Sequence, residues 1–285
     1  MFDSDKKIIF FDGAMGTMLY DCGLKKGERP DILNITNPSA VENVHRMYVE
    51  AGSDIICTNT FGANAEDLRQ TGYSPEEIIT AAVNNAKRAA KNETKVALDI
   101  GPLGKLIEPL GELKREHAYE LFKQQAVAGQ KAGADLAAIE TMSDLEEVKL
   151  AISAVRENTA LPVFVTMTFN EKGFTFTGCT PEVFSQTAEK MGAAAVGLNC
   201  SLAPREMINT AERFIKSTNL PVIVKPNAGL PDFATGKYNL SAPQFARHML
   251  NFAEMGVKII GGCCGTTPEY VKITVDEILT AKNKF

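Results

Sequence analysis

Three features are missing from this sequence of 285 residues: a long hydrophobic run, a block of basic residues and a cluster of histidines. No segment approaches the roughly 20 apolar residues of a membrane-spanning helix, and residues 1–7 lack the apolar run of a signal peptide. The net charge is -5, which offers no basic surface for nucleic acid. We therefore expect a cytoplasmic protein that binds neither membranes nor nucleic acid. Its 6 cysteines should stay reduced and free for packing, catalysis or metal binding.

Short apolar segments alternate regularly with segments of helical periodicity. Eight segments have the apolar composition of buried strands: Ile8–Phe11, Ile55–Asn59, Val96–Ile100, Leu136–Glu140, Val163–Thr168, Ala195–Asn199, Val222–Lys225 and Lys258–Ile260. The stretches between them repeat apolar residues with the period of a helix, as Ile78, Ala82 and Ala86 do. Strands that are separated by helices pair in parallel and are buried on both faces.

The number of strand–helix units distinguishes two architectures. Eight units in a chain of this length match a single (β/α)8 TIM barrel, which we expect to span residues 1–285 as one domain. A doubly wound parallel sheet is the alternative, because eight units can also be laid out flat. Residues 61–78 leave room for an extra helix or a long loop after the second strand.

Three cysteines follow predicted strands at the end where a barrel carries its active site. Cys200 comes directly after the sixth strand, and Cys263 and Cys264 come after the eighth, between glycines. Adjacent thiols between glycines gain little from packing, so this pattern indicates an open zinc site with a vacant fourth position. Packing of free cysteines is the alternative, and Cys179, in the loop after the fifth strand, is a further candidate ligand.

Three thiolate ligands would favour a particular chemistry. They weaken zinc as a Lewis acid toward water but suit a substrate thiol, which coordination deprotonates into a nucleophile. Alkylation of a thiol is therefore the predicted reaction. Hydrolysis by zinc-bound hydroxide normally uses histidine ligands and a nearby base, and His45, His117 and His248 fall in helical stretches where we expect surface or capping roles.

Four segments carry a family resemblance. Residues 11–17 (FDGAMGT), 58–64 (TNTFGAN), 197–201 (GLNCS) and 261–268 (GGCCGTTP) resemble, in the same order, the motifs of the homocysteine S-methyltransferase family. The likeness covers nearly the whole chain. The loops DIGPLG and KPNAGLP are most similar to the N-terminal homocysteine-binding module of cobalamin-dependent methionine synthase, and betaine- and S-methylmethionine-dependent relatives are more distant there.

The resemblance implies a zinc-bearing (β/α)8 barrel in which Cys200, Cys263 and Cys264 hold Zn2+. Homocysteine sulfur takes the fourth position and is methylated to methionine. By the same resemblance, Asn227 is a candidate fourth ligand when substrate is absent.

The resemblance also implies how the amino-acid end of homocysteine is held. Asp12 and Glu140 match the acidic groups that hold the ammonium and that we count as catalytic, although alone they would suit a turn and a strand-end salt bridge equally well. The remaining predicted substrate-binding residues are the backbone at Gly13, Ala14 and Met15 for the carboxylate, the nearby loop residues Thr60 and Phe61, and Asn199.

The methyl donor is the part of the reaction that the sequence leaves open. Cobalamin-dependent methionine synthase continues into folate- and cobalamin-binding domains, whereas this sequence continues from Val271 with one predicted helix. We expect methylcobalamin on a separate corrinoid protein as donor. The alternatives are a small donor such as S-methylmethionine or betaine, a homocysteine-binding module that is inactive alone, a fragment of a longer protein, or a different thiol acceptor.

Overall fold

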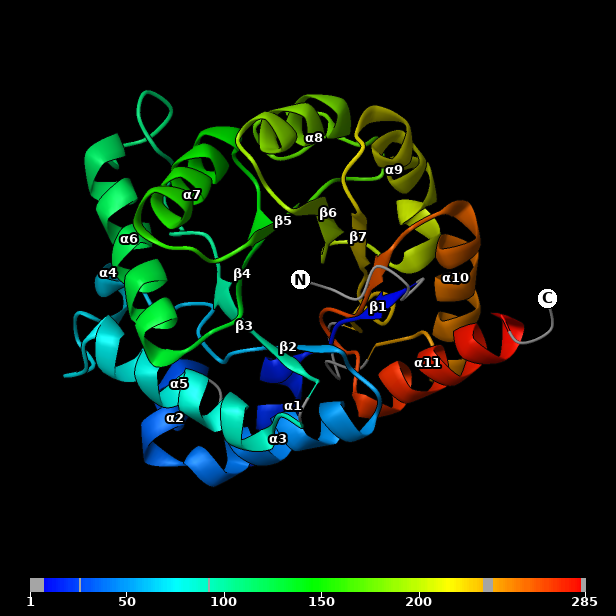
Figure 1. The fold of residues 1–285 in the computed structure, drawn as a ribbon, viewed down its shortest axis with the longest axis horizontal. Coiled ribbons are helices and arrows are strands. Elements are labelled where there is room, and N and C mark those ends of the chain that lie inside the picture. Colours follow the sequence, from blue (N-terminus) through cyan, green and yellow to red (C-terminus); the bar gives the residue numbers. More distant parts are fainter. Residues whose placement is uncertain (1–7, 26, 92, 233–237, 283–285) are drawn as a thin grey trace.

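Eight parallel strands form a barrel that is surrounded by helices (Figure 1). The computed structural model describes residues 8–25, 27–91, 93–232 and 238–282. The strands are β1 (Ile9–Phe10), β2 (Ile55–Cys57), β3 (Lys95–Ile100), β4 (Leu136–Met142), β5 (Val163–Met167), β6 (Ala195–Asn199), β7 (Val222–Lys225) and β8 (Ile259–Ile260). Their order is β1-β8-β7-β6-β5-β4-β3-β2, and a parallel bridge between Phe11 and Ile55 joins the two ends of this order. The predicted TIM barrel is therefore confirmed over the doubly wound sheet.

The helices occupy the stretches between the strands. They are α1 (Met15–Asp21), the 3-10 turn η1 (Pro30–Ile32), α2 (Leu33–Thr36), α3 (Pro38–Glu50), α4 (Ala65–Leu68), α5 (Pro75–Ala89), α6 (Arg115–Ala132), α7 (Leu145–Asn158), α8 (Pro181–Lys190), α9 (Pro204–Ser217), α10 (Ala242–Met255) and α11 (Pro268–Lys282). The short α4 lies in the region where an extra helix or long loop was predicted. None of these helices combines the length and the apolar composition that crossing a bilayer would need.

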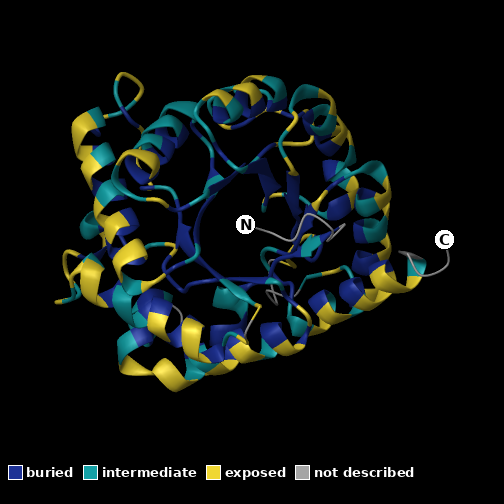
Figure 2. Cartoon of the chain, in the orientation of Figure 1, coloured by how far each residue is buried: buried dark blue, intermediate teal, exposed yellow. Residues whose placement is uncertain are grey.

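The strands bury both of their faces, as parallel strands between helices must. One set of side chains packs outward beneath the helices, and the other fills the barrel. Figure 2 shows the strands of the barrel coloured mainly as buried. The inner set is Phe11, Ile55, Cys57, Ala97, Leu136, Ala138, Phe164, Ala195, Ile223 and Ile259. Because side chains alternate along a strand, the inward face continues from Ala97, Ala138 and Ile223 to Asp99, Glu140 and Lys225. The barrel interior thus changes from apolar to charged at the carboxyl ends of its strands.

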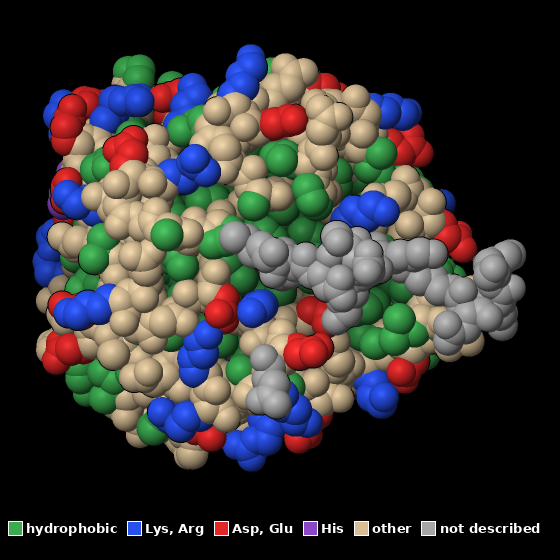
Figure 3. Space-filling model, in the orientation of Figure 1, with side chains coloured by type: hydrophobic (Ala, Val, Ile, Leu, Met, Phe, Trp, Pro, Cys, Tyr) green, Lys and Arg blue, Asp and Glu red, His purple; other side chains and the backbone are tan. Residues whose placement is uncertain are grey.

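On the face of the molecule that Figure 3 shows, acidic and basic side chains are interspersed. This distribution matches the modest net charge of -5. Exposed pairs such as Lys131 with Glu76, at 2.6 Å, join neighbouring helices and contribute little to stability individually.

His45 was predicted to be a surface or capping residue, and this prediction is wrong. It is fully buried in α3, and neither of its ring nitrogens has a hydrogen-bond partner. Burial alone lowers the pKa of His45 to about 3, so the ring stays neutral. His117, by contrast, is exposed and lies 3.1 Å from Glu66 Oε1, and His248 is half-buried on α10.

Acid should destabilise the fold through His45. In the unfolded chain the imidazole binds a proton below its usual pKa of about 6.5, whereas in the folded protein it does so only near pH 3. The free energy of unfolding therefore decreases as pH falls between these two values. Between pH 8 and pH 5.5 the loss should be about 1.4 kcal/mol. Urea unfolding of wild type and His45→Leu at both pH values measures it as the difference between the two proteins. An identical difference at both pH values would contradict this account.

Candidate active site

The loops after β6 and β8 bring three thiols together. The Sγ atoms of Cys200, Cys263 and Cys264 lie within 4.8 Å of one another, and those of Cys200 and Cys264 are 3.8 Å apart. Zinc–sulfur bonds of about 2.3 Å at tetrahedral angles place sulfur atoms about 3.8 Å apart, so this spacing fits a zinc ion. Cys179 does not belong to this group, and Cys57 is buried inside the barrel wall.

The end of β7 braces both cysteine loops. Cys200 N–H donates to Lys225 O at 3.0 Å, and Cys263 N–H donates to Pro226 O at 2.8 Å. Cys264 N–H donates to the side-chain Oδ1 of Asn227 at 3.1 Å. In this structure the oxygen of Asn227, the predicted fourth ligand, therefore serves as a hydrogen-bond acceptor that positions Cys264.

The three thiols do not ionise alike. Contacts with Cys200 and Cys263 lower the pKa of Cys264 to about 3, whereas contacts with Cys200 and Cys264 raise the pKa of Cys263 well above its usual value. Adjacent thiolates repel one another, so the cluster by itself favours one negative charge. A bound cation would be needed to make all three sulfurs thiolates.

A cavity of about 280 Å³ opens beside the cysteines. It is lined by Asp12, Gly13, Ala14, Met15, Gly16, Thr17, Pro30, Cys57, Thr58, Asn59, Thr60, Phe61, Asp99, Glu140, Thr141, Cys200, Lys225, Gly262, Cys263 and Cys264. Most of the residues predicted for the site are therefore brought into one cavity. Asn199 and Asn227 lie outside its lining and contact it through hydrogen bonds.

A buried ion pair forms one wall of this cavity. Lys225 Nζ lies 2.5 Å from Glu140 Oε2 and 4.7 Å from the centre of the Phe11 ring. Burial opposes protonation of Lys225, but the neighbouring Cys57, Glu140 and Asp12 raise its pKa well above the usual value, so it is an ammonium. Gly261 leaves space for this side chain, because a Cβ there would lie 2.6 Å from Phe11 Cβ and 3.2 Å from Lys225 Cγ.

Two further carboxyl groups are buried in the same wall. Asp12 accepts a hydrogen bond from Cys57 N–H at 2.7 Å through Oδ2, while its Oδ1 has no partner. Burial raises the pKa of Asp12 to about 7. Burial, and then the charge of Glu140, raise the pKa of Asp99 well above its usual value.

Asp99 and Lys225 were not predicted as site residues. Both begin segments that carry the family resemblance, residues 99–104 (DIGPLG) and 225–231 (KPNAGLP), but the resemblance gave neither residue a role. The available signal is a charged residue placed two positions after an inward apolar one, at the end of a strand. Ala97 to Asp99 and Ile223 to Lys225 both follow this pattern.

A local distortion of β4 presents Glu140. The register of β4 against β5 shifts between Ile139 and Met142, and Thr141 has a φ of 64°. Asn199 holds this distortion: its Oδ1 accepts from Thr141 N–H at 2.9 Å, and its Nδ2 donates to Thr141 Oγ1 at 2.8 Å. Bulges beside active sites commonly re-aim a side chain in this way. The contacts of Asn199 thus connect it to Glu140 through the backbone.

The remaining predicted residues lie on two loops of the cavity. The backbone from Gly13 to Met15 was predicted to bind the substrate carboxylate. Within this segment Ala14 N–H already donates to Thr266 O at 2.9 Å, so this amide is not free for that contact. Thr60 Oγ1 donates to Asp99 O at 2.7 Å, and the Phe61 side chain is 43% exposed at the mouth.

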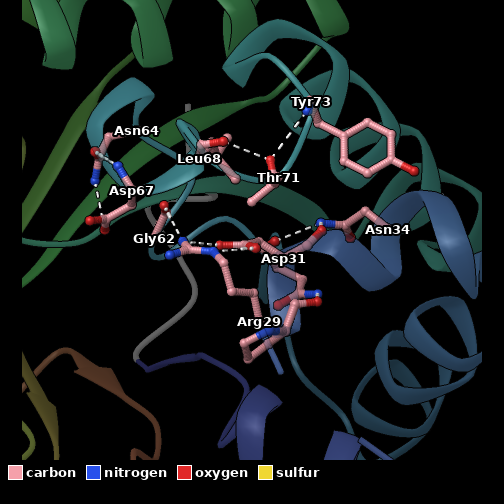
Figure 4. Close-up of polar contacts among 11 residues, drawn as sticks. Arg29, Asp31, Asn34, Gly62, Asn64, Asp67, Leu68, Thr71 and Tyr73 are labelled. Atoms are coloured by element: carbon pink, nitrogen blue, oxygen red, sulfur yellow. Dashed lines mark hydrogen bonds and ion pairs between the residues drawn. The ribbon is translucent and has the colours of Figure 1, made fainter. Parts of the chain in front are cut away.

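The loop that carries Thr60 and Phe61 is anchored by residues 29–34, which include η1 and the start of α2 (Figure 4). Arg29 Nη2 pairs with Asp31 Oδ2 at 2.7 Å and donates to Gly62 O at 2.8 Å. Asn34 Nδ2 donates to both Asp31 O and Asn59 O at 2.7 Å. These bonds fix the loop after β2 against the N-terminal part of the chain.

Comparison with known proteins gives a consistent relationship. The family described as homocysteine S-methyltransferase matches residues 9–278. The chain is 31% identical to methionine synthase of Mycobacterium leprae and 30% identical to that of Mycobacterium tuberculosis, in each case over 94% of this chain and 24% of the relative. It therefore spans about a quarter of the length of these relatives. A crystal structure of the homocysteine methyltransferase MmuM from Escherichia coli, in its oxidized form, has the same fold, with a TM-score of 0.83 and 22% identity over 98% of this chain and 97% of that one.

Removing one partner of the buried ion pair should destabilise the protein. Lys225→Met leaves Glu140, whose side chain is 14% exposed, as an uncompensated and largely buried charge, which should cost about 3 kcal/mol. The double variant Lys225→Met/Glu140→Gln removes both charges and should regain most of that loss. Chemical unfolding of the three proteins measures the two differences. A single variant as stable as wild type would contradict the pairing.

Proposed function

The chain belongs to the homocysteine S-methyltransferase family, and on this premise we propose that it methylates homocysteine to methionine in a zinc-dependent reaction. The observation that carries the proposal is the spacing of three sulfur atoms beside a cavity lined with buried acidic groups. Cys200, Cys263 and Cys264 would hold the zinc. When bound, the metal would supply one thing: deprotonation of the substrate thiol at neutral pH.

The protein groups bind the other end of the substrate. Asp12 and Glu140 face the cavity and attract an ammonium group, while the backbone from Gly13 to Met15 lines the side where the carboxylate would bind. Thr60 and Phe61 belong to the same lining. Asn199 supports Glu140 through Thr141, and Asn227, which is bonded to Cys264, is the candidate for the fourth zinc position before substrate binds.

The methyl donor is proposed to be methylcobalamin on a corrinoid protein that acts in trans. The support for this choice is the resemblance of residues 99–104 (DIGPLG) and 225–231 (KPNAGLP) to the homocysteine-binding module of cobalamin-dependent methionine synthase. The methionine synthases that the chain matches are about four times as long, and the chain matches 24% of their length. We propose that residues 1–285 act as one homocysteine-binding domain in the cytoplasm. The competing proposals are a small donor, S-methylmethionine or betaine, and a binding module without activity of its own.

Loss of one cysteine should remove the metal. We expect Cys263→Ser to lower zinc content from about one ion per chain to a small fraction and to lower homocysteine methylation about 100-fold or more, because two thiolates bind zinc far more weakly than three. Elemental analysis and methionine formation measure the two effects. The exposed Cys22→Ser is the matched control and should keep its zinc. Methylation by a zinc-free protein would overturn the proposal.

A donor screen separates the three routes. The purified chain is incubated with homocysteine and, separately, a methylated corrinoid protein, free methylcobalamin, S-methylmethionine or betaine. We expect methionine to form roughly ten times faster or more with the protein-bound donor than with free methylcobalamin, because contacts remote from the methyl group assist its transfer. Turnover with a small donor alone would remove the need for a partner. Homocysteine binding without turnover for every donor would favour the inactive binding module.

A further inference from the structure

The cavity holds more acidic groups than its one lysine balances. Asp12, Asp99 and Glu140 all line it, and among the described residues the ammonium of Lys225 pairs with Glu140. Asp12 and Asp99 each keep an Oδ1 atom that is buried without a hydrogen-bond partner. Buried carboxyl oxygens without partners are rare, because the lost hydration is not compensated. Two of them in one cavity therefore point to a ligand that supplies hydrogen-bond donors.

Asp99 is held rigidly in this position. It is 8% exposed, and it is the inward residue near the end of β3. Its N–H donates to Thr58 Oγ1 at 3.0 Å, and its carbonyl oxygen accepts from Thr60 Oγ1 at 2.7 Å. These bonds occupy the backbone of Asp99 and leave its carboxyl group to face the cavity. Such pre-organisation is what a binding group needs.

An ammonium group carries three N–H donors. Three carboxyl groups, those of Asp12, Asp99 and Glu140, line the cavity that would receive it. Glu140 has one oxygen paired with Lys225, which fixes the position of this carboxyl group before a ligand arrives. The number of acceptor groups thus matches the number of donors.

We propose that Asp99 is a third carboxyl ligand of the substrate ammonium, beside Asp12 and Glu140, and that it makes the site select thiols that carry an amino group. This inference rests on the proposed function, because it concerns the same substrate. Asp99 had no role in the sequence analysis. Its contact with the ammonium would give a physical reason for the choice of substrate.

The test compares two thiols that differ by the amino group: homocysteine and 4-mercaptobutyrate. Asp99→Asn keeps the shape of the side chain but replaces the carboxyl group with an amide, which cannot become an anion when an ammonium binds. We expect kcat/KM for homocysteine to fall about tenfold or more, the usual effect of losing one charged hydrogen bond, mainly through KM. With 4-mercaptobutyrate the change should stay within about twofold, because this substrate has no ammonium to lose a contact. An equal fall with both thiols would overturn the proposal, as would no change with either.

Two controls separate this effect from a structural one. Asp144→Asn changes another buried aspartate, which caps α7 by accepting from Glu146 N–H at 3.1 Å, and asparagine caps a helix equally well. It should leave the ratio between the two thiols unchanged. Zinc content of both variants should equal that of wild type.

A structure of the wild-type protein with homocysteine tests the contact without any variant. The proposal expects the substrate nitrogen within hydrogen-bond distance, about 3 Å, of an Asp99 oxygen. A nitrogen beyond reach of Asp99 would overturn it. A wild-type protein that neither binds nor methylates homocysteine would instead refute the proposed function. Normal wild-type activity with an unchanged Asp99→Asn preference would refute this inference alone.

Discussion

A parallel barrel brings the carboxyl ends of all its strands to one rim, and the whole site depends on this constraint. Cys200 and the pair Cys263–Cys264 are far apart in sequence but follow strands β6 and β8, which are separated in the barrel by β7 alone. The strand β7 also supports the site directly. Its end accepts hydrogen bonds from the backbone of both cysteine loops and contributes Lys225 to the acidic wall. One four-residue strand therefore ties the sulfur cluster to the carboxyl cluster.

The site is built from features that oppose stability. Thr141, Cys200 and Ser201 have φ values of 64°, 59° and 63°, a backbone conformation that non-glycine residues adopt at a cost of order 1–3 kcal/mol each. Asp12 and Asp99 add carboxyl oxygens that are buried without partners. These costs are concentrated at the rim, while the apolar layer beneath it is satisfied by packing alone. A metal ion would offset the repulsion among the three thiolates. An ammonium would donate hydrogen bonds to the carboxyl oxygens that have no partner.

The sequence could predict the barrel because its signals are local and repeated. Eight apolar segments with helical stretches between them specify the architecture, and β6 and β7 begin and end where they were predicted. The position of the three cysteines after strands then predicts that they meet. His45 shows the limit of such signals: a histidine on a helix is equally compatible with solvent and with the core, and only the packing of α3 against its neighbours buries it. The bulge at Thr141 is likewise invisible, since it depends on side-chain bonds from Asn199, 58 residues away.

Asp99 and Lys225 were missed for a related reason. A strand's end can be read from its composition, but which of its last residues points inward depends on the phase of the alternation, which the structure supplies. Once it is known which strand-end residues point inward, the two ends of the cavity can be seen to carry different functional groups. With a metal bound, the three sulfurs would suit a thiol, and the three carboxyl groups beside the lysine would suit an ammonium. The proposed acceptor fits both ends, because it carries a thiol and an amino group in one small molecule. This argument for the acceptor holds whichever donor delivers the methyl group, because it depends only on residues that line the cavity of this chain.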